Sequence, residues 1–195
     1  MQTRTPLPIR PPVSRSARSG SKFLPLLLLV AALGALWLTP TCKAQDNLPA
    51  PRDQVHCITA LDGDSLLVEW AGRSNGRFQI RLLGVDCPEK GQEFSNVART
   101  MSRSFCNGRV LDLEYGPHRT DRYGRVLAYV WSDGKMLNEI LVLQGLALAI
   151  AHDREEQHAQ RLARAEGQAR IDKTGFWSKG GLEMTPRRFR KLHRR

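Results

Sequence analysis

The chain has 195 residues, of which 41% are hydrophobic, so it is long enough for one well-cored domain and too short for two ordinary domains plus a leader. Its formal net charge of +11 comes from the two ends, because residues 1–44 and 187–195 each hold six Lys or Arg and no acid. The body between them holds 18 basic and 19 acidic residues, which excludes a uniformly basic surface for binding polyanions.

The first 44 residues have the layout of an export signal. Basic residues precede an apolar run at 23–38, and Ala44 stands where a signal peptidase would cut. We therefore expect an exported protein, periplasmic or secreted, with a linker at residues 45–54. The apolar run is shorter than the roughly 20 residues that span a membrane, but an uncleaved anchor formed by residues 23–38 is the alternative.

Four cysteines are present, at positions 42, 57, 87 and 106. Cleavage after Ala44 would leave three, so both one disulfide plus one thiol and three free thiols remain open. The chain has no CxxC motif and no Cys/His cluster, which gives little support to a zinc site.

Short strands dominate the first half of the body. Alternating apolar and polar residues, bounded by turn residues, predict strands at 55–61, 65–70, 77–84, 110–115 and 126–131. Helices are predicted between and after them, at 93–106, 137–144 and 153–171. In the last of these, Asp153 is expected to cap the start, and Leu162 and Ala169 to lie on the packed face.

Five strands with three helices predict an α+β domain at residues 55–180. Three strands precede the first helix, which argues against a repeated βαβ sheet. A small closed or partly open barrel would remove the exposed strand edges, and such barrels often bind oligonucleotides. Residues 181–195 form a basic C-terminal tail that is suited to contacts with phosphates, with a solvated, disordered terminus as the alternative.

Two acidic segments are candidates for chemistry. Asp64 closes an Asp-Gly-Asp turn, in which Gly63 tolerates a positive φ, so one carboxylate can turn inward at a strand junction. Asp86 follows a predicted strand directly, and Glu89 comes three residues later. Carboxylates, backbone carbonyls and waters are the ligands of a hard cation such as calcium, so Asp64 and Asp86 are candidate metal ligands. Glu89 is placed to orient or deprotonate a water.

Two arginines are candidates for contacts with phosphate. Arg81 lies on the strand before Asp86, and Arg125 enters the last predicted strand. A guanidinium presents a planar set of donors that matches phosphate, and two of them can neutralise the charge that builds up as a phosphodiester is attacked. Structural ion pairs with Asp or Glu are the alternative for both.

These residues resemble the staphylococcal nuclease (thermonuclease) family. The resemblance extends from about Val55 to Trp177 and rests on several motifs in the right order. They are DGDS at 62–65, IRLLGVDCPE at 80–89, DRYGRVLAYV at 121–130, DGKMLN at 133–138 and LVLQGLA at 141–147.

The resemblance implies a five-stranded OB-fold β-barrel with three α-helices, and a calcium-dependent hydrolase acting on DNA and RNA. It implies no obligate protein partner, and we expect a monomer. Carried over by position, the metal ligands are Asp64, Asp86 and the backbone carbonyl of Cys87, the general base is Glu89, the catalytic arginines are Arg81 and Arg125, and the substrate-binding residues are Arg122 and Tyr123.

Some positions depart from the family pattern. The loop after Glu89 is shorter than in the best-known member, and pocket tyrosines are replaced by residues such as Ala151 and Asp153, which weakens the expectation of base stacking there. The competing functions are a non-catalytic OB-fold module that binds nucleic acid and a protein-interaction scaffold. Neither has a need for the acids and arginines together.

Overall fold

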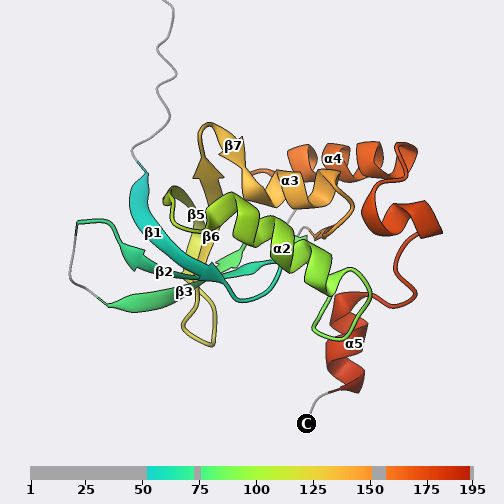
Figure 1. Ribbon diagram of the computed structural model, residues 1–195, viewed down its shortest axis with the longest axis horizontal. Helices are drawn as coiled ribbons and strands as arrows, with labels where there is room; N and C mark the ends of the chain where they lie inside the picture. The colour runs from blue at the N-terminus through green and yellow to red at the C-terminus, as the bar shows by residue number, and fades with distance from the viewer. Residues whose placement is uncertain (1–51, 73–75, 151–156, 194–195) are drawn as a thin grey trace, which may run out of the picture. The chain divides into compact units, whose positions relative to one another are not determined.

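The computed structural model describes residues 52–72, 76–150 and 157–193 (Figure 1). The predicted export signal, most of the predicted linker, and the positions 151 and 153 lie outside these residues. Export, the alternative anchor and the Asp153 cap therefore stay predictions. In the described ranges, no helix has the length and apolar character needed to cross a membrane.

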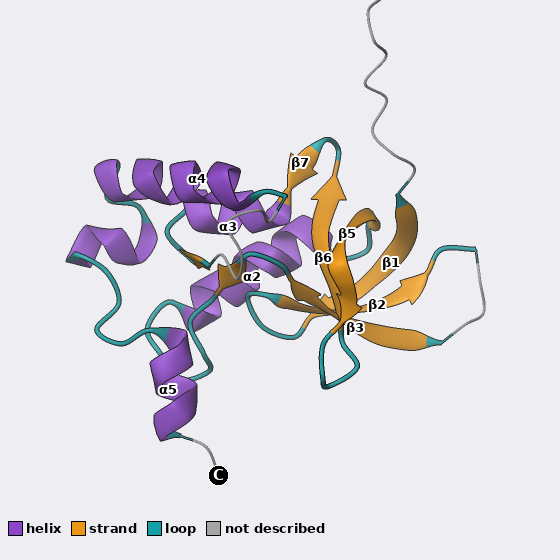
Figure 2. Ribbon diagram, turned by 180° about the vertical axis from the view of Figure 1, so that it is seen from behind, coloured by secondary structure: helices purple, strands orange, loops and turns teal. Residues whose placement is uncertain are grey.

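A closed barrel of five strands forms the body of the fold (Figure 2). Neighbouring strands pair in the order β3-β2-β1-β5-β6, and a parallel pairing of β3 with β6 closes the ring. The strands are β1 Asp53–Ala60, β2 Ser65–Trp70, β3 Arg77–Leu82, β5 Val110–Thr120 and β6 Val126–Ser132. Closure leaves no long edge exposed, and the predicted barrel is confirmed.

Three very short strands extend the barrel. β7 Lys135–Met136 makes a hairpin with β6, and β4 Val85–Asp86 pairs with β8 Leu148–Ala149 in a separate two-stranded sheet. The second pairing matters for function because it fixes the backbone of Asp86 opposite Leu148.

The helices cover one side of the barrel. They are α2 Ser95–Cys106, α3 Leu137–Leu143, α4 Ala159–Ile171, the 3-10 helix η2 Gly175–Lys179 and α5 Pro186–Leu192. The first three α-helices are those predicted, and Leu162 and Ala169 lie on the buried face of α4 as expected. Helix α5 is additional, and it means that residues 186–192 are not a disordered tail.

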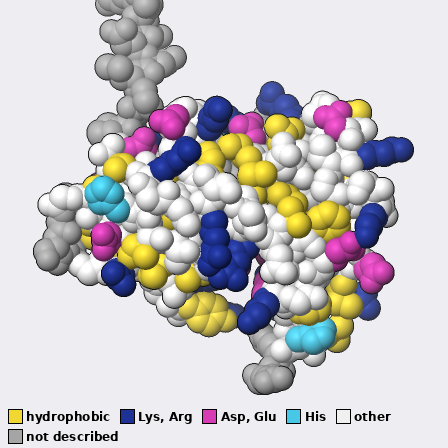
Figure 3. Space-filling model, viewed as in Figure 1, with side chains coloured by type: hydrophobic (Ala, Val, Ile, Leu, Met, Phe, Trp, Pro, Cys, Tyr) yellow, Lys and Arg dark blue, Asp and Glu magenta, His cyan; other side chains and the backbone are white. Residues whose placement is uncertain are grey.

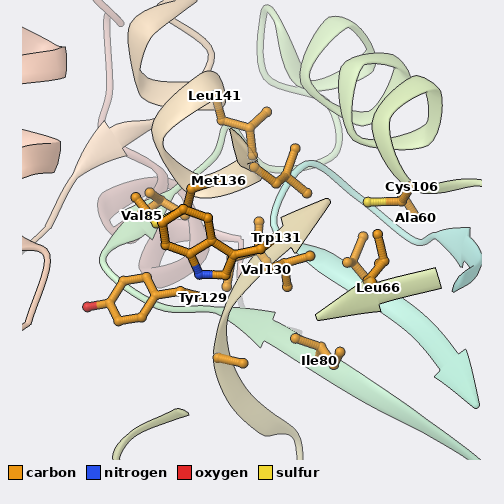
Figure 4. Packing of buried hydrophobic residues seen from close by; sticks show 14 of the residues in the cluster. Ala60, Leu66, Ile80, Val85, Cys106, Tyr129, Val130, Trp131, Met136 and Leu141 are labelled. Carbon is orange, nitrogen blue, oxygen red and sulfur yellow. The ribbon is translucent and has the colours of Figure 1, made fainter. Parts of the chain in front are cut away.

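The core fills the barrel and continues beneath the helices. Figure 4 shows side chains from β2, β3 and β6 meeting residues of α3 and the short strands. Leu66, Ile80 and Val130 are fully buried, as is Leu141 of α3. The inward-facing positions are the apolar ones of the alternating sequence pattern, which is why that pattern predicts the strands.

The turn between β1 and β2 is held against helix α2. The Ser102 hydroxyl donates to the carbonyl of Gly63 at 2.6 Å. A Cβ on Gly63 would lie 2.7 Å from Cys87 Sγ and 2.8 Å from Ala98 Cβ. Gly63 does not have a positive φ, so the turn does not use the conformational freedom of glycine. Glycine is needed here because the helix and the β4 loop approach too closely for a side chain.

All three cysteines of the described residues are buried free thiols. The side chains of Cys57 and Cys106 share a hydrogen bond, which lowers the pKa of the Cys57 thiol and raises that of Cys106. Of the two arrangements that the sequence left open, the structure has three free thiols.

Helix α3 ends in a Schellman motif at Gly145. The Gly145 amide donates to Val142 and the Leu146 amide donates to Leu141, both at 2.9 Å. Gly145 has φ +60°, and a Cβ there would lie 2.1 Å from the carbonyl oxygen of Thr174. The end of α3 is therefore in backbone contact with the segment that follows α4.

Gly145→Ala is expected to lower the free energy of unfolding by roughly 2–5 kcal/mol, because left-handed strain and a backbone clash act together. Gly180→Ala is the matched control, since Gly180 has φ +86° but open space around its Cβ position. It should lower stability by only about 1 kcal/mol. Urea unfolding of the two variants measures the difference, and equal losses would show that the contact with Thr174 does not matter.

Candidate active site

Two buried carboxylates lie side by side at one end of the barrel. Asp64 closes the turn before β2 and is 7% exposed, and Asp86 ends β4 and is 4% exposed. Arg81 of β3 bridges them, with Nη1 2.9 Å from Asp64 Oδ2 and Nη2 3.2 Å from Asp86 Oδ1. The structure thus brings three of the predicted site residues into direct contact.

The main chain fixes the bridging guanidinium. Arg81 Nη1 also donates to the carbonyls of Leu82 and Val85, each at 3.0 Å. These bonds hold the side chain over the junction of β3 and β4, so its donors reach both acids without rearrangement. Arg81 therefore forms structural ion pairs, the alternative that the sequence left open, and it forms them with both acids.

Asp64 is held in an unfavourable environment for a charge. Burial raises the pKa of its carboxyl group to about 7, although the Arg81 guanidinium and the Cys87 amide act in the opposite direction. The Cys87 amide donates to Asp64 Oδ2 at 2.9 Å, and the Ser65 hydroxyl donates to Oδ1 at 3.3 Å. Both oxygens are thereby fixed in position.

Cys87 contributes to this region through its main chain. Its side chain is buried and packs beneath Gly63. Burial raises the pKa of the thiol well above its usual range, so the group stays neutral rather than acting as a soft thiolate ligand. The main-chain carbonyl of Cys87 is therefore the group of this residue that suits a hard cation.

The oxygen atoms that could bind a metal here fit a hard cation better than a soft one. Among the described residues, no group of three or more His, Cys, Asp or Glu side chains could hold a metal ion. The protein ligands would be the carboxylates of Asp64 and Asp86 with a main-chain carbonyl, completed by water. Such all-oxygen sets suit calcium rather than zinc.

Glu89 lies on the loop between β4 and α2. Its amide donates to Gln92 Oε1 at 2.9 Å, and Gln92 Nε2 donates to the carbonyl of Met184 at 2.9 Å. One glutamine therefore joins this loop to the segment before α5. The Glu89 side chain is 34% exposed, so it lies at the surface of the acidic group rather than within it.

The C-terminal helix places a third arginine on the acids. Arg190 donates from Nη1 to Asp86 Oδ1 at 2.9 Å and from Nη2 to Asp86 Oδ2 at 3.1 Å, and it also pairs with Glu89. Figure 1 shows α5 lying beside the loop that leads into α2. Hydrogen bonds to Asp86 raise the pKa of Arg190, so the guanidinium stays charged.

Sequence reasoning did not find Arg190 as a site residue. A signal was present, because Thr185 and Pro186 form a helix start, with threonine as N-cap and proline at the first helical position. The structure has this cap, in which the Arg188 amide donates to Thr185 Oγ1 at 3.3 Å. The high charge of the segment is typical of a solvated tail, whereas its capping residues favour a helix.

Arg125 is positioned by Asp121 across the loop between β5 and β6. The Asp121 carboxylate accepts from the amides of Tyr123 and Arg125 at 2.9 and 3.0 Å and from Arg125 Nε at 2.8 Å. Burial would raise the pKa of Asp121, but these bonds together hold it below its usual value. Asp121 is a second residue that sequence reasoning missed, although an Asp four residues before an Arg in a turn favours this arrangement.

Arg125 immediately precedes β6, the strand that pairs with β3. The β3–β6 pairing sets Ile80 opposite Val126 and Arg81 opposite Leu127, so the loop that carries Arg125 enters the barrel beside the strand of Arg81. Arg125 itself is bound to Asp121 and is not joined by any hydrogen bond of the described residues to Asp64, Asp86 or Glu89. The structure thus brings Arg81, Asp64 and Asp86 into contact and leaves Arg125 on a separate ion pair.

Arg122 and Tyr123 form the exposed tip of the same loop. Arg122 Nη2 donates to Tyr123 Oη at 2.7 Å, and the Tyr123 side chain is 68% exposed. The Arg125 guanidinium lies 5.8 Å from the Tyr123 ring centroid. Both residues are free to meet a ligand that approaches Arg125.

Basic side chains are concentrated locally on the folded part. Figure 3 shows dark blue Lys and Arg atoms gathered near the middle of the lower half of one face, with mixed side chains elsewhere. This distribution agrees with a nearly neutral body that has local positive regions.

Comparison with known proteins shows the family of this chain. The family described as "Staphylococcal nuclease homologue" matches residues 79–179. The chain belongs to the staphylococcal nuclease family. It is 33% identical over 127 residues to a thermonuclease of Staphylococcus hyicus, a match that covers 62% of this chain and 73% of the relative.

A second relative of this nuclease is similar over a longer stretch. Endonuclease YncB of Bacillus subtilis (strain 168) is 34% identical over 151 residues, covering 73% of this chain and 68% of the relative. A thermonuclease of Staphylococcus intermedius is 28% identical over 125 residues, covering 61% and 73%. The predicted family and the predicted class of enzyme, a phosphodiester hydrolase, are confirmed.

Proposed function

We propose that this nuclease is a calcium-dependent endonuclease that hydrolyses phosphodiester bonds in both DNA and RNA. The observation that carries the proposal is the pair of buried acids, Asp64 and Asp86, held together by Arg81 at the end of β3. A barrel that only bound nucleic acid would gain nothing from burying two carboxylates at a site for a polyanion.

Each residue has a distinct role in the proposal. The cation would be held by Asp64, Asp86 and the carbonyl of Cys87. It would polarise a phosphate oxygen and reduce the negative charge of the site. Glu89 orients a water and takes its proton at the carboxylate. Arg81 and Arg125 donate to the phosphate oxygens, where negative charge increases as the water attacks.

Substrate binding is assigned to the loop tip. Arg122 offers a guanidinium beside the exposed ring of Tyr123, and a ring of this kind can stack on a base or sugar. We also propose that the protein acts as a monomer and is exported, with its signal removed after Ala44. These two parts of the proposal rest on the sequence alone.

Removal of calcium is expected to abolish cleavage. The purified protein is incubated with a single-stranded RNA, a single-stranded DNA and a duplex DNA, with calcium and with a chelator specific for it. Both nucleic acids should be cut with calcium, and addition of chelator should lower the rate at least about 100-fold. Cleavage that persists in chelator, or is absent with calcium at high enzyme concentration, would contradict the proposal.

A further inference from the structure

We infer that the C-terminal strap, residues 184–192, is an inhibitory element whose Arg190 competes with the metal ion for Asp86 and pairs with Glu89, the proposed general base. The inference rests on the proposed function, since it concerns the same cation. It predicts that metal binding and docking of the strap oppose each other.

The geometry of Arg190 supports competition. Its two terminal nitrogens lie 2.9 and 3.1 Å from the two oxygens of Asp86, and the first nitrogen also pairs with Glu89. This is the fork arrangement of a guanidinium on a carboxylate, the strongest common form of the pair. A cation bound by Asp86 would be within a few ångströms of this fixed positive charge, and like charges at that distance repel.

The hydrogen bonds that Asp86 already accepts leave few of its lone pairs for a metal ion. Its Oδ1 already accepts from Arg81 Nη2 at 3.2 Å in addition to Arg190. A cation that binds this carboxylate must therefore share it with two guanidinium groups. Arg81 is fixed by main-chain carbonyls of β3 and β4, whereas Arg190 is carried by a terminal helix, so Arg190 is the group that gives way.

Pairing with Arg190 also affects the proposed general base. A guanidinium bound to Glu89 occupies a carboxylate oxygen that would otherwise accept a proton from water. The docked strap would therefore hinder both proton transfer and metal binding. A single movement of the strap would relieve both effects.

The remaining contacts of the strap are few, which makes release feasible. Gln92 binds the carbonyl of Met184, Pro186 is buried, and Phe189 lies over Gly91, where a Cβ would be 3.8 Å from its ring. Helix α5 has only seven residues, and an isolated helix of that length is not stable in water. Loss of the Arg190 pairs would remove its strongest attachment.

Calcium titration of the whole protein tests the inference. Binding is measured by calorimetry for the unaltered chain, Arg190→Ala and Arg190→Lys. Arg188→Ala is the matched control, because Arg188 is exposed on the same helix and carries the same charge. Arg190→Ala is expected to bind calcium about 5- to 150-fold more tightly, the usual range of coupling between sites. Arg190→Lys should lie between, and Arg188→Ala should match the unaltered chain.

Hydrogen exchange gives the reciprocal measurement, with no dependence on activity. Calcium should lower the protection of amides 187–192 in the unaltered chain, since coupling acts equally in both directions. Unchanged protection, or equal or weaker calcium affinity in Arg190→Ala, would overturn the inference while leaving a calcium-binding nuclease. Failure of every variant to bind calcium would overturn the proposed cofactor and the inference with it.

Discussion

Arg125→Ala is expected to lower kcat by about 10²–10³-fold, the effect of removing one preorganised donor from a developing negative charge. Asp121 fixes the guanidinium through Nε and Nη2, each 2.8 Å from the carboxylate, so its donors are already oriented when substrate arrives. A side chain held in this way loses little entropy on binding the transition state. The measurement is steady-state cleavage of a fluorogenic oligonucleotide at saturating calcium.

Arg119→Ala is the control for this variant. Arg119 lies on β5, just before the loop that carries Arg125. Its guanidinium stacks 4.4 Å from the centroid of the Tyr115 ring, outside the group of acids. It should keep kcat within about twofold, while Asp121→Asn should fall between the two because it loosens Arg125 without removing it. If Arg125→Ala cleaved at the rate of Arg119→Ala, Arg125 would have no role in the chemical step.

Glu89→Gln is expected to lower kcat by about 10²–10⁴-fold, the usual contribution of general acid–base catalysis. Glutamine keeps the shape of the side chain, and the loop remains tied by the bonds of Gln92 to the Glu89 amide and to Met184. It cannot accept a proton from water. The loss should therefore appear in kcat, with KM nearly unchanged.

Glu93→Gln supplies the comparison for Glu89. Glu93 lies on the same loop and forms an exposed ion pair with Lys179, and such surface pairs contribute little. Its kcat should match that of the unaltered enzyme. A Glu89→Gln enzyme with the same rate as Glu93→Gln would assign the proton transfer to another group.

The barrel could be predicted from the sequence because its physical determinants are local. Strand β2 has the limits expected, and β3 differs only because Gly84, at φ +70°, separates it from β4. Strand β5 is longer than predicted and continues through Gly116 and Pro117 to Thr120. A register shift between Tyr115 and Thr120 accommodates the proline, which is the position in a sheet where proline is tolerated.

The acidic pair could also be predicted, since strand ends carry Asp64 and Asp86 and the motifs occur in family order. The contact of Arg190 with Asp86 could not, because it joins residues 104 positions apart through a helix whose docking depends on tertiary contacts. The packing of Gly63 against Ala98 and Cys87 is of the same kind. Local pattern predicts a turn there, but only the folded neighbours explain why no side chain fits.

The pairing of β4 with β8 has a consequence for biosynthesis. Asp86 is held opposite Leu148, which lies more than sixty residues later in the chain. A ribosome-bound chain that ends before β8 thus carries all the acids and arginines of the barrel but lacks the strand that fixes the backbone of Asp86. We expect such a nascent chain to cleave the messenger RNA that encodes it less efficiently than the finished domain would.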